Sequence, residues 1–123
     1  MKIAIVGSRT WKDEYAIADY IELLADDPGV DVIVSGGAVG VDSFAETWAK
    51  YYELKTEIYL PEWDKYGKQA GIIRNQLIVD NSEKVVAFWD GKSKGTLNTI
   101  ERALKAPNIK QIIISKEQDD AKK

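Results

Sequence analysis

The sequence predicts one α/β domain, built from a parallel five-stranded sheet with helices on both faces. Its 123 residues suit a single hydrophobic core, and five short apolar runs have the length and β-branched content of strands. Between these runs lie segments whose apolar residues recur at the helical period. Apolar strands that alternate with helices are typical of a parallel sheet that is buried on both faces.

The predicted strands begin almost at the first residue and recur along the whole chain. In order they are Lys2–Val6, Asp31–Ser35, Thr56–Leu60, Lys84–Trp89 and Lys110–Ser115. Valine or isoleucine occurs in all five, and these side chains pack well on a pleated surface. We therefore expect five strands that all run in the same direction.

Four segments between the strands are predicted to be helices. Asp13 and Glu14 favour the start of the first, Pro28-Gly29 ends it, and Pro107 closes the last. The four apolar faces consist of Ile17, Ala18, Ile21, Leu24 and Ala25; Val41, Phe44, Ala45, Trp48 and Tyr52; Ile73, Leu77 and Ile78; and Leu97, Ile100, Ala103 and Leu104. Right-handed crossovers then give a Rossmann-like three-layer sandwich over residues 1–115. Residues 116–123 are polar or small and are expected to form a flexible tail.

The composition excludes several kinds of chemistry. Cysteine and histidine are both absent, so no disulfide, thiolate nucleophile or imidazole base is available. We expect neither a metal site nor a cofactor, and any reaction must use carboxylates, hydroxyls, lysine, arginine or tyrosine. The net charge of −3 argues against a broad nucleic-acid-binding face. No apolar run approaches the roughly 20 residues that span a bilayer, so we expect a cytoplasmic protein.

A glycine-rich turn follows the second predicted strand and opens the second helix. It reads Ser35-Gly36-Gly37-Ala38-Val39-Gly40-Val41-Asp42. Glycine permits positive φ, which lets successive N–H groups converge on one anion, and a helix N-terminus adds the positive end of its dipole. Ligands of open parallel sheets bind beyond the carboxyl ends of the strands, where this turn is placed. The turn therefore predicts a phosphate site.

Two common phosphate motifs do not fit this chain. The dinucleotide fingerprint requires three glycines after the first strand, but only Gly7 is present, and the second strand ends in Ser35 rather than an acid. Gly91-Lys92-Ser93 has the letters of a P-loop ending, but Val86 stands where the first glycine of that motif belongs. The sequence therefore argues against an ordinary NAD-binding Rossmann domain and against a P-loop NTPase.

Four motifs in order carry a resemblance to a known superfamily. They are Gly7-Ser8-Arg9, Ser35-Gly36-Gly37-Ala38-x-Gly40-Val41-Asp42, Ala70-Gly71-x-x-Arg74-Asn75 and Lys94-Gly95-Thr96-x-x-Thr99. From residue 2 to about residue 115 the chain resembles the SLOG superfamily, which unites the DNA-processing protein DprA/Smf with LOG-type phosphoribohydrolases. It is most similar to the small stand-alone YspA/YpsA-related proteins of that superfamily.

The resemblance implies that the glycine turn and the later Gly-Thr turn hold a nucleotide-like ligand. Arg74 would then reach its phosphate, although the alternative that Arg74 is a structural ion-pair partner stays open. The expected ligand-binding residues are Gly7, Ser8, Arg9, Ser35, Gly36, Gly37, Gly40, Asp42, Arg74, Asn75, Gly95 and Thr96. A tryptophan, one of Trp11, Trp63 and Trp89, is a further candidate for stacking on a base, with core or rim packing as the alternative.

Catalysis is less clearly indicated than binding. LOG enzymes carry a glutamate where this chain has Thr99, and Glu101 lies about 200° around the helix from that position. Asp42 and Glu46 are the remaining candidates for an acid–base residue. Asp42 is equally suited to complement the helix N-terminus, and Glu46 to lie on a solvated face.

Three functions therefore remain open. The favoured one is a domain that binds or senses a nucleotide or nucleotide-derived ligand. The second is an N-glycosidase or phosphoribohydrolase that uses Asp42 or Glu46, and the third is a DprA-like binder of single-stranded DNA, which the acidic charge disfavours. We expect no membrane partner, and the aromatic residues Trp48, Tyr51 and Tyr52 suggest a homo-oligomer.

Overall fold

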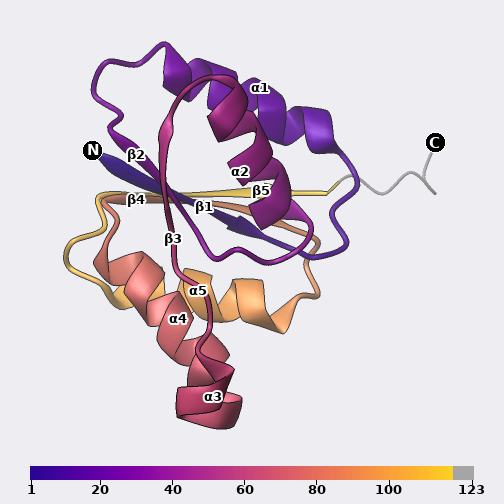
Figure 1. Cartoon of the computed structure of the whole chain (residues 1–123), viewed down its shortest axis with the longest axis vertical. Coiled ribbons are helices and arrows are strands. Elements are labelled where there is room, and N and C mark those ends of the chain that lie inside the picture. The colour runs from indigo at the N-terminus through magenta and orange to yellow at the C-terminus, as the bar shows by residue number, and fades with distance from the viewer. Residues whose placement is uncertain (118–123) are drawn as a thin grey trace.

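Five parallel strands form one central sheet between two layers of helices (Figure 1). The computed structural model describes residues 1–117. The strands are β1 (Lys2–Gly7), β2 (Val32–Ser35), β3 (Lys55–Ile58), β4 (Lys84–Trp89) and β5 (Gln111–Lys116). Their order across the sheet is β3-β2-β1-β4-β5, and every neighbouring pair is parallel. The predicted Rossmann-like α/β fold is confirmed.

Four helices of eleven or twelve residues cover the sheet. They are α1 (Glu14–Ala25), α2 (Val41–Tyr51), α4 (Ala70–Asp80) and α5 (Lys94–Lys105). α1 and α2 lie together on one face, whereas α4 and α5 lie together on the other (Figure 1). A short helix α3 (Trp63–Tyr66) and a 3₁₀ turn (Gly67–Gln69) precede α4 and were not predicted. Within residues 1–117, none of these helices has the length and apolar character that crossing a bilayer requires.

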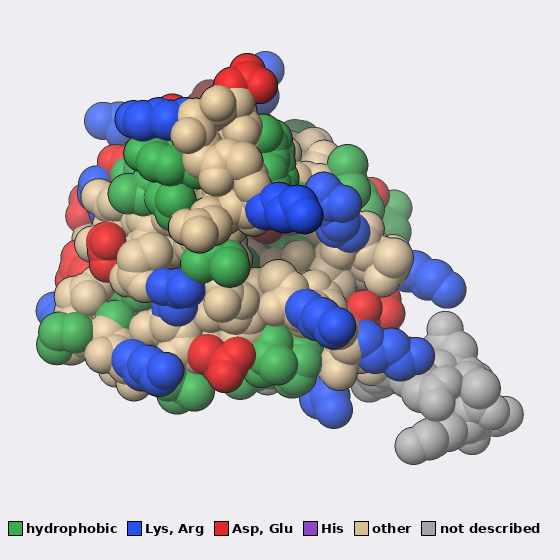
Figure 2. Space-filling model, turned by 90° about the horizontal axis from the view of Figure 1, so that it is seen from below, with side chains coloured by type: hydrophobic (Ala, Val, Ile, Leu, Met, Phe, Trp, Pro, Cys, Tyr) green, Lys and Arg blue, Asp and Glu red, His purple; other side chains and the backbone are tan. Residues whose placement is uncertain are grey.

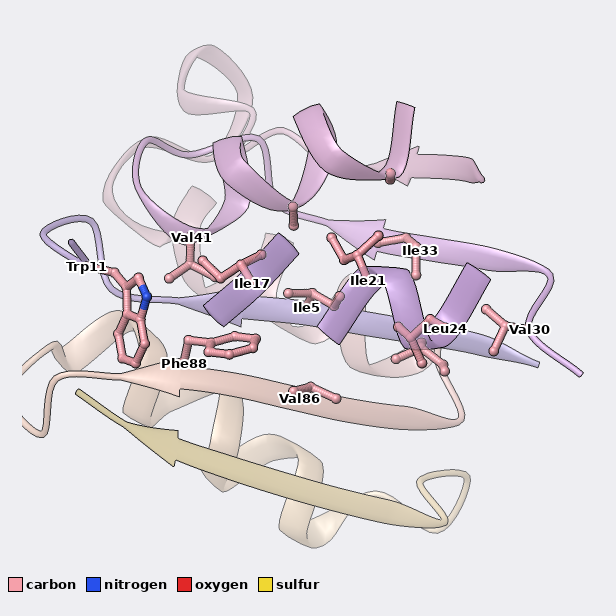
Figure 3. Packing of buried hydrophobic residues seen from close by; sticks show 13 residues of the cluster. Ile5, Trp11, Ile17, Ile21, Leu24, Val30, Ile33, Val41, Val86 and Phe88 are labelled. Atoms are coloured by element: carbon pink, nitrogen blue, oxygen red, sulfur yellow. The ribbon is translucent and has the colours of Figure 1, made fainter. Parts of the chain in front are cut away.

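The strands bury side chains on both faces, which is why their sequences are apolar throughout. Because successive side chains point to opposite faces of a strand, Ile3 and Ile5 pack under α1 and α2, and Ala4 and Val6 face α4 and α5. Figure 3 shows the first of these clusters, in which the side chains of α1 lie over those of β1, β2 and β4. At its edge the rings of Trp11 and Phe88 meet edge to face, with centroids 5.4 Å apart.

Six strand ends differ from the predictions, five of them by one residue, and pairing explains the larger difference at the end of β3. β3 ends at Ile58 rather than at residue 60 because it is an edge strand, and its only partner, β2, ends at Ser35 opposite Ile58. β5 extends to Lys116, which pairs with Trp89. Residue 116, the first of the predicted tail, is therefore part of the sheet, and residues 118–123 of that tail lie outside the described residues.

The strand order places a topological switch point beside β1. From β1 the chain turns to β2 and β3 on one side, and it later returns to β4 and β5 on the other. The carboxyl ends of β1, β2 and β4 therefore bring three loops to the same edge of the sheet: residues 8–13, 36–40 and 90–93. This is the position at which open α/β sheets bind ligands.

Candidate functional site

Ser8 joins the three loops at the switch point. The Ser8 N–H donates to the carbonyl oxygen of Phe88 at 3.0 Å, and the Ser8 carbonyl oxygen accepts from the N–H of Val41 at 3.3 Å. The Ser8 hydroxyl accepts from the N–H of Asp90 at 3.0 Å. Ser8 is fully buried, so the residue that was expected to touch the ligand holds the loops together instead.

Glycine is required where the first two loops meet. Gly40 has a φ of +79°, and a Cβ at this position would lie 2.5 Å from the carbonyl oxygens of both Ser8 and Arg9. A Cβ on Gly7 would collide with the carbonyl oxygen of Phe88 and with the side chain of Val41. These two glycines allow backbones to approach where any side chain would separate them.

The glycine turn uses its own polar groups to define its shape. The Ala38 N–H donates to Asp42 Oδ2 at 3.2 Å, and the N–H of Val41 is taken by Ser8. The Gly36 carbonyl oxygen accepts from Arg74 Nη1 at 2.5 Å. The N–H groups of this turn were expected to converge on an anion, but those of residues 38 and 41 already have partners. The turn therefore positions Asp42 and Arg74 rather than forming an anion seat by itself.

A cavity of about 240 Å³ lies at the switch point, between the end of β1, the glycine turn, α4 and the first turn of α5. On the molecular face that carries α3, α4 and α5, Lys and Arg side chains stand around a hollow (Figure 2). The cavity is lined by Val6, Gly7, Arg9, Ala38, Asp42, Arg74, Asn75, Ile78, Ser93, Gly95, Thr96 and Thr99.

Seven of the twelve predicted ligand-binding residues line this cavity, and five do not. The seven are Gly7, Arg9, Asp42, Arg74, Asn75, Gly95 and Thr96. The five that do not line it are Ser8, Ser35, Gly36, Gly37 and Gly40. Sequence reasoning missed Ser93, although its position three residues before Thr96 at a helix start is a recognisable capping pattern.

Arg74 reaches from α4 across to the glycine turn. Besides its bond to Gly36, its Nε donates to Asn75 Oδ1 at 3.0 Å, and its other N–H groups have no partner within residues 1–117. No carboxylate in that part of the chain lies within ion-pair distance, so the alternative of a structural ion pair is not what the structure shows. Burial lowers the pKa of Arg74, as does Arg9, and Asp42 opposes both effects. Arg74 therefore presents positive charge to the cavity that is only partly compensated.

Asp42 is the one carboxyl group that lines the cavity as residues 1–117 form it. Only 6% of the residue is exposed, and its Oδ1 has no hydrogen-bond partner in this part of the chain. Burial raises the pKa of Asp42 to about 7, and the charge of Glu46 adds to that rise. The N–H groups of Ala38 and Gly36 and the charge of Arg74 act in the opposite direction. Asp42 therefore exchanges its proton near neutral pH.

The N-terminus of α5 forms the opposite wall. Ser93 caps this helix, since its Oγ accepts from the Thr96 N–H at 3.3 Å. Asp90 holds the preceding loop, because its Oδ1 accepts from the N–H groups of Lys92 and Ser93, both at 2.8 Å. These two bonds lower the pKa of Asp90. The first N–H groups of α5 and the positive end of its dipole thus border the cavity.

The second catalytic candidate, Glu46, does not share the cavity with Asp42. Its Oε2 accepts a 2.6 Å hydrogen bond from the Ser35 hydroxyl, and it lines a separate hollow beside β3. Thr99, which replaces the glutamate of LOG enzymes, is buried and donates to the Gly95 carbonyl oxygen. Within residues 1–117 there is also no group of three Asp or Glu side chains that is suited to a metal ion.

The three tryptophans considered for base stacking lie outside the lining of the cavity. Trp11 is in the core with Phe88, and Trp89 Nε1 donates to the Ser93 carbonyl oxygen at 3.0 Å. Trp63 is 57% exposed on α3. Core and rim packing thus account for Trp11 and Trp89.

The fold and the cavity define a class: a Rossmann-like domain with a polar, arginine-bearing cavity at its switch point. The family described as the YspA, cpYpsA-related SLOG family matches residues 1–66. The Gene 61 protein of Mycobacterium phage D29 is 33% identical over 112 residues, which are 85% of this chain and 90% of that protein. The chain therefore belongs to the YspA, cpYpsA-related SLOG family, as its motifs indicated.

Two solved structures of DNA processing protein A (DprA) share the fold. The Streptococcus pneumoniae protein has a TM-score of 0.77 and 24% identity, and the match covers 97% of this chain and 52% of that one. The Helicobacter pylori protein, described for its single-stranded DNA binding mode, has a TM-score of 0.76 and 23% identity, with 98% and 67% covered. This chain thus spans about half of the first protein and two thirds of the second.

Proposed function

We propose that the cavity at the switch point binds a nucleotide or a nucleotide-derived ligand through its phosphate. The observation that carries this proposal is Arg74, whose guanidinium borders the cavity with free N–H groups and no ion-pair partner within residues 1–117. The first turn of α5 and the side chain of Arg9 border the same cavity. Guanidinium groups and helix N-termini are both preferred partners of phosphate.

The size of the cavity favours the sugar-phosphate end of such a ligand. Its volume of about 240 Å³ is below the about 300–1,000 Å³ of pockets that enclose a whole drug-sized molecule. The phosphate and sugar would occupy the cavity, and the base would lie at its rim. Val6 and Ile78 supply the apolar part of the lining.

The test is isothermal titration calorimetry of the full chain with AMP, GMP, CMP, UMP, cyclic AMP, ADP-ribose and NAD. We expect Arg74→Gln to weaken the tightest interaction about 10- to 100-fold, since a charge-assisted hydrogen bond is lost. Lys110→Gln is the control for loss of a positive charge, because Lys110 pairs with Glu83 before β4 and β5 begin and lies outside the cavity lining. Equal effects of the two substitutions, or no binding of any probe, would contradict the proposal.

A second experiment, fluorescence anisotropy with a labelled oligonucleotide, separates ligand binding from DNA binding. A DprA-like binder would retain a fluorescent single-stranded oligonucleotide at low salt and release it as salt rises. The net charge of −3 gives little support to that behaviour. Anisotropy that rises with the oligonucleotide, while no mononucleotide binds, would replace the proposed function with DNA binding.

A second candidate, an N-glycosidase, is favoured by the state of Asp42. A carboxyl group with a pKa of about 7 beside a sugar is suited to acid–base catalysis at neutral pH. Hydrolysis adds water to the sugar carbon and releases the base with a proton, and chromatography detects the free base. Asp42→Asn is expected to abolish its release and Asp80→Asn to leave it unchanged. Release that persists in Asp42→Asn would remove this assignment.

A further inference from the structure

The unpartnered oxygen of Asp42 indicates which part of a ligand it would contact. We infer that Asp42 accepts a hydrogen bond from a sugar hydroxyl of the bound nucleotide, and that the site therefore prefers ribonucleotides to deoxyribonucleotides. This inference rests on the proposed function and makes its ligand class more specific.

The Asp42 carboxyl group has one hydrogen-bonded oxygen and one without a partner within residues 1–117. Asp42 is 94% buried, and Oδ2 is bound by the Ala38 N–H while Oδ1 has no partner within residues 1–117. Buried polar atoms are nearly always hydrogen-bonded, because leaving one unpaired is unfavourable. Asp42 lines the cavity but Oδ1 itself has almost no exposed surface, so a donor on the ligand satisfies it when the carboxyl group turns Oδ1 toward the cavity.

Positive and negative side chains occupy different parts of the cavity lining. Asp42 is contributed by α2, and the charged groups that act on it are Arg74 from α4 and Glu46 from α2 itself. Arg9, from the loop after β1, also lines the cavity, and its positive charge repels that of Arg74. A phosphate is attracted to the arginines and to the N-terminus of α5 and is repelled by the Asp42 carboxylate. The group beside Asp42 should therefore be neutral and carry a donor, as a sugar hydroxyl does.

The pH dependence of binding has a sign that separates a hydroxyl from a phosphate. Burial raises the pKa of Asp42 to about 7. A hydroxyl that donates to the carboxylate favours the ionised form, so binding should tighten as the pH rises from 6 to 8 by more in the unaltered chain than in Asp42→Asn, since both share the titration of the ligand's own phosphate at about pH 6. A phosphate beside Asp42 would favour the protonated form and give the opposite trend.

The experiment uses the unaltered chain and three forms of one ligand. Calorimetry at pH 8 compares the tightest-binding ribonucleoside monophosphate with its 2′-deoxy and 3′-deoxy counterparts. Removing the hydroxyl that Asp42 accepts should weaken binding about 10-fold or more, whereas removing the other should change it little. Equal affinities of the three would overturn this inference and leave the proposed function intact. No binding of any of them, nor of cyclic AMP, ADP-ribose or NAD, would overturn the proposed function itself.

A substitution then assigns the preference to Asp42. In Asp42→Ala, the ratio of ribonucleotide to deoxyribonucleotide affinity should fall to about 1, because the acceptor is gone. The ratio is measured within one variant, so a general loss of affinity cancels. Asp80→Ala is the matched control, since Asp80 is an exposed residue of α4 that bonds Gln76, and it should keep the ratio of the unaltered chain. A ratio that survives in Asp42→Ala would assign the hydroxyl to another residue.

Discussion

Replacing Asp42 with asparagine should remove a specific pH dependence from the free energy of unfolding. Burial raises the pKa of this carboxyl group from 3.8 to about 7 in the folded chain, a rise of about 3 units. Each unit corresponds to about 1.4 kcal/mol, so keeping Asp42 ionised in the folded state costs about 4 kcal/mol. Asparagine has the same shape as the neutral acid and avoids this cost.

The sign of the effect follows from the two pKa values. Between pH 4 and pH 7 the folded chain keeps the proton of Asp42, whereas the unfolded chain has released it. Stability contributed by this group is therefore greatest below pH 4, falls as the pH rises to about 7, and stays constant above it. Asp42→Asn should exceed the stability of the unaltered chain by only about 1 kcal/mol near pH 4.5 and by up to about 4 kcal/mol at pH 8.

The assay is urea-induced unfolding, followed by circular dichroism, of both proteins between pH 4.5 and pH 8.5. The difference between the two free energies is the quantity of interest, because the titrations of groups that do not interact with Asp42 cancel in it. Asp80→Asn serves as the control for removal of an exposed carboxylate. A difference between Asp42→Asn and the unaltered chain that does not change with pH would refute the account of Asp42 as a buried, largely uncompensated acid.

Four other substitutions test the framework of the site and of the sheet beneath it. Gly40→Ala should destabilise the chain by about 3 kcal/mol in the same unfolding assay, because its Cβ meets two carbonyl oxygens at a φ of +79°. Gly95→Ala, whose Cβ meets open space, should leave stability equal or raise it by up to about 1 kcal/mol, and an equal loss in both would contradict this reasoning. Asp90, whose pKa is lowered by two backbone N–H groups, contributes stability above pH 3.8 that is lost as the pH falls through its folded pKa. Asp90→Ala should therefore be less stable than the unaltered chain at pH 7, and the gap should narrow as the pH falls below 3.8, as acid unfolding would reveal. Ile5→Ala removes a fully buried side chain of β1 and should cost about 2–5 kcal/mol, a loss that thermal unfolding would detect.

The fold was predictable because its signals are local and mutually consistent. Each strand was recognised by β-branched runs, and Asp13 correctly indicated the start of α1, where its Oδ1 accepts from the Ala16 N–H. The misplaced end of β3 shows where this reasoning stops. Tyr59 and Leu60 continue the apolar pattern, but strand pairing ends with β2, and pairing is a property of the neighbouring strand.

The site was predictable only in outline. Asp42 and Glu46 lie one turn apart on α2, and periodicity alone would aim both at one pocket. The structure separates them, because Glu46 accepts a hydrogen bond from the Ser35 hydroxyl, whereas Asp42 accepts one from the Ala38 N–H in the glycine turn. Likewise, Ser8 follows β1 as a ligand residue would, but its polar groups are used by neighbouring loops. These outcomes depend on partners that are distant in sequence.

The class of the domain, the parallel sheet, the edge at which the loops gather and the family of the chain could all be predicted from the order of the amino acids. Hydrophobic period, strand length and turn chemistry are short-range properties, so one chain suffices to show them. Only the tertiary structure decided which residues face the cavity. It placed Arg74 on the Gly36 carbonyl oxygen, 38 residues away, and left Asp42 Oδ1 buried without a partner. Burial and hydrogen-bond satisfaction are set by atoms that meet only after folding, and they give this site its chemistry.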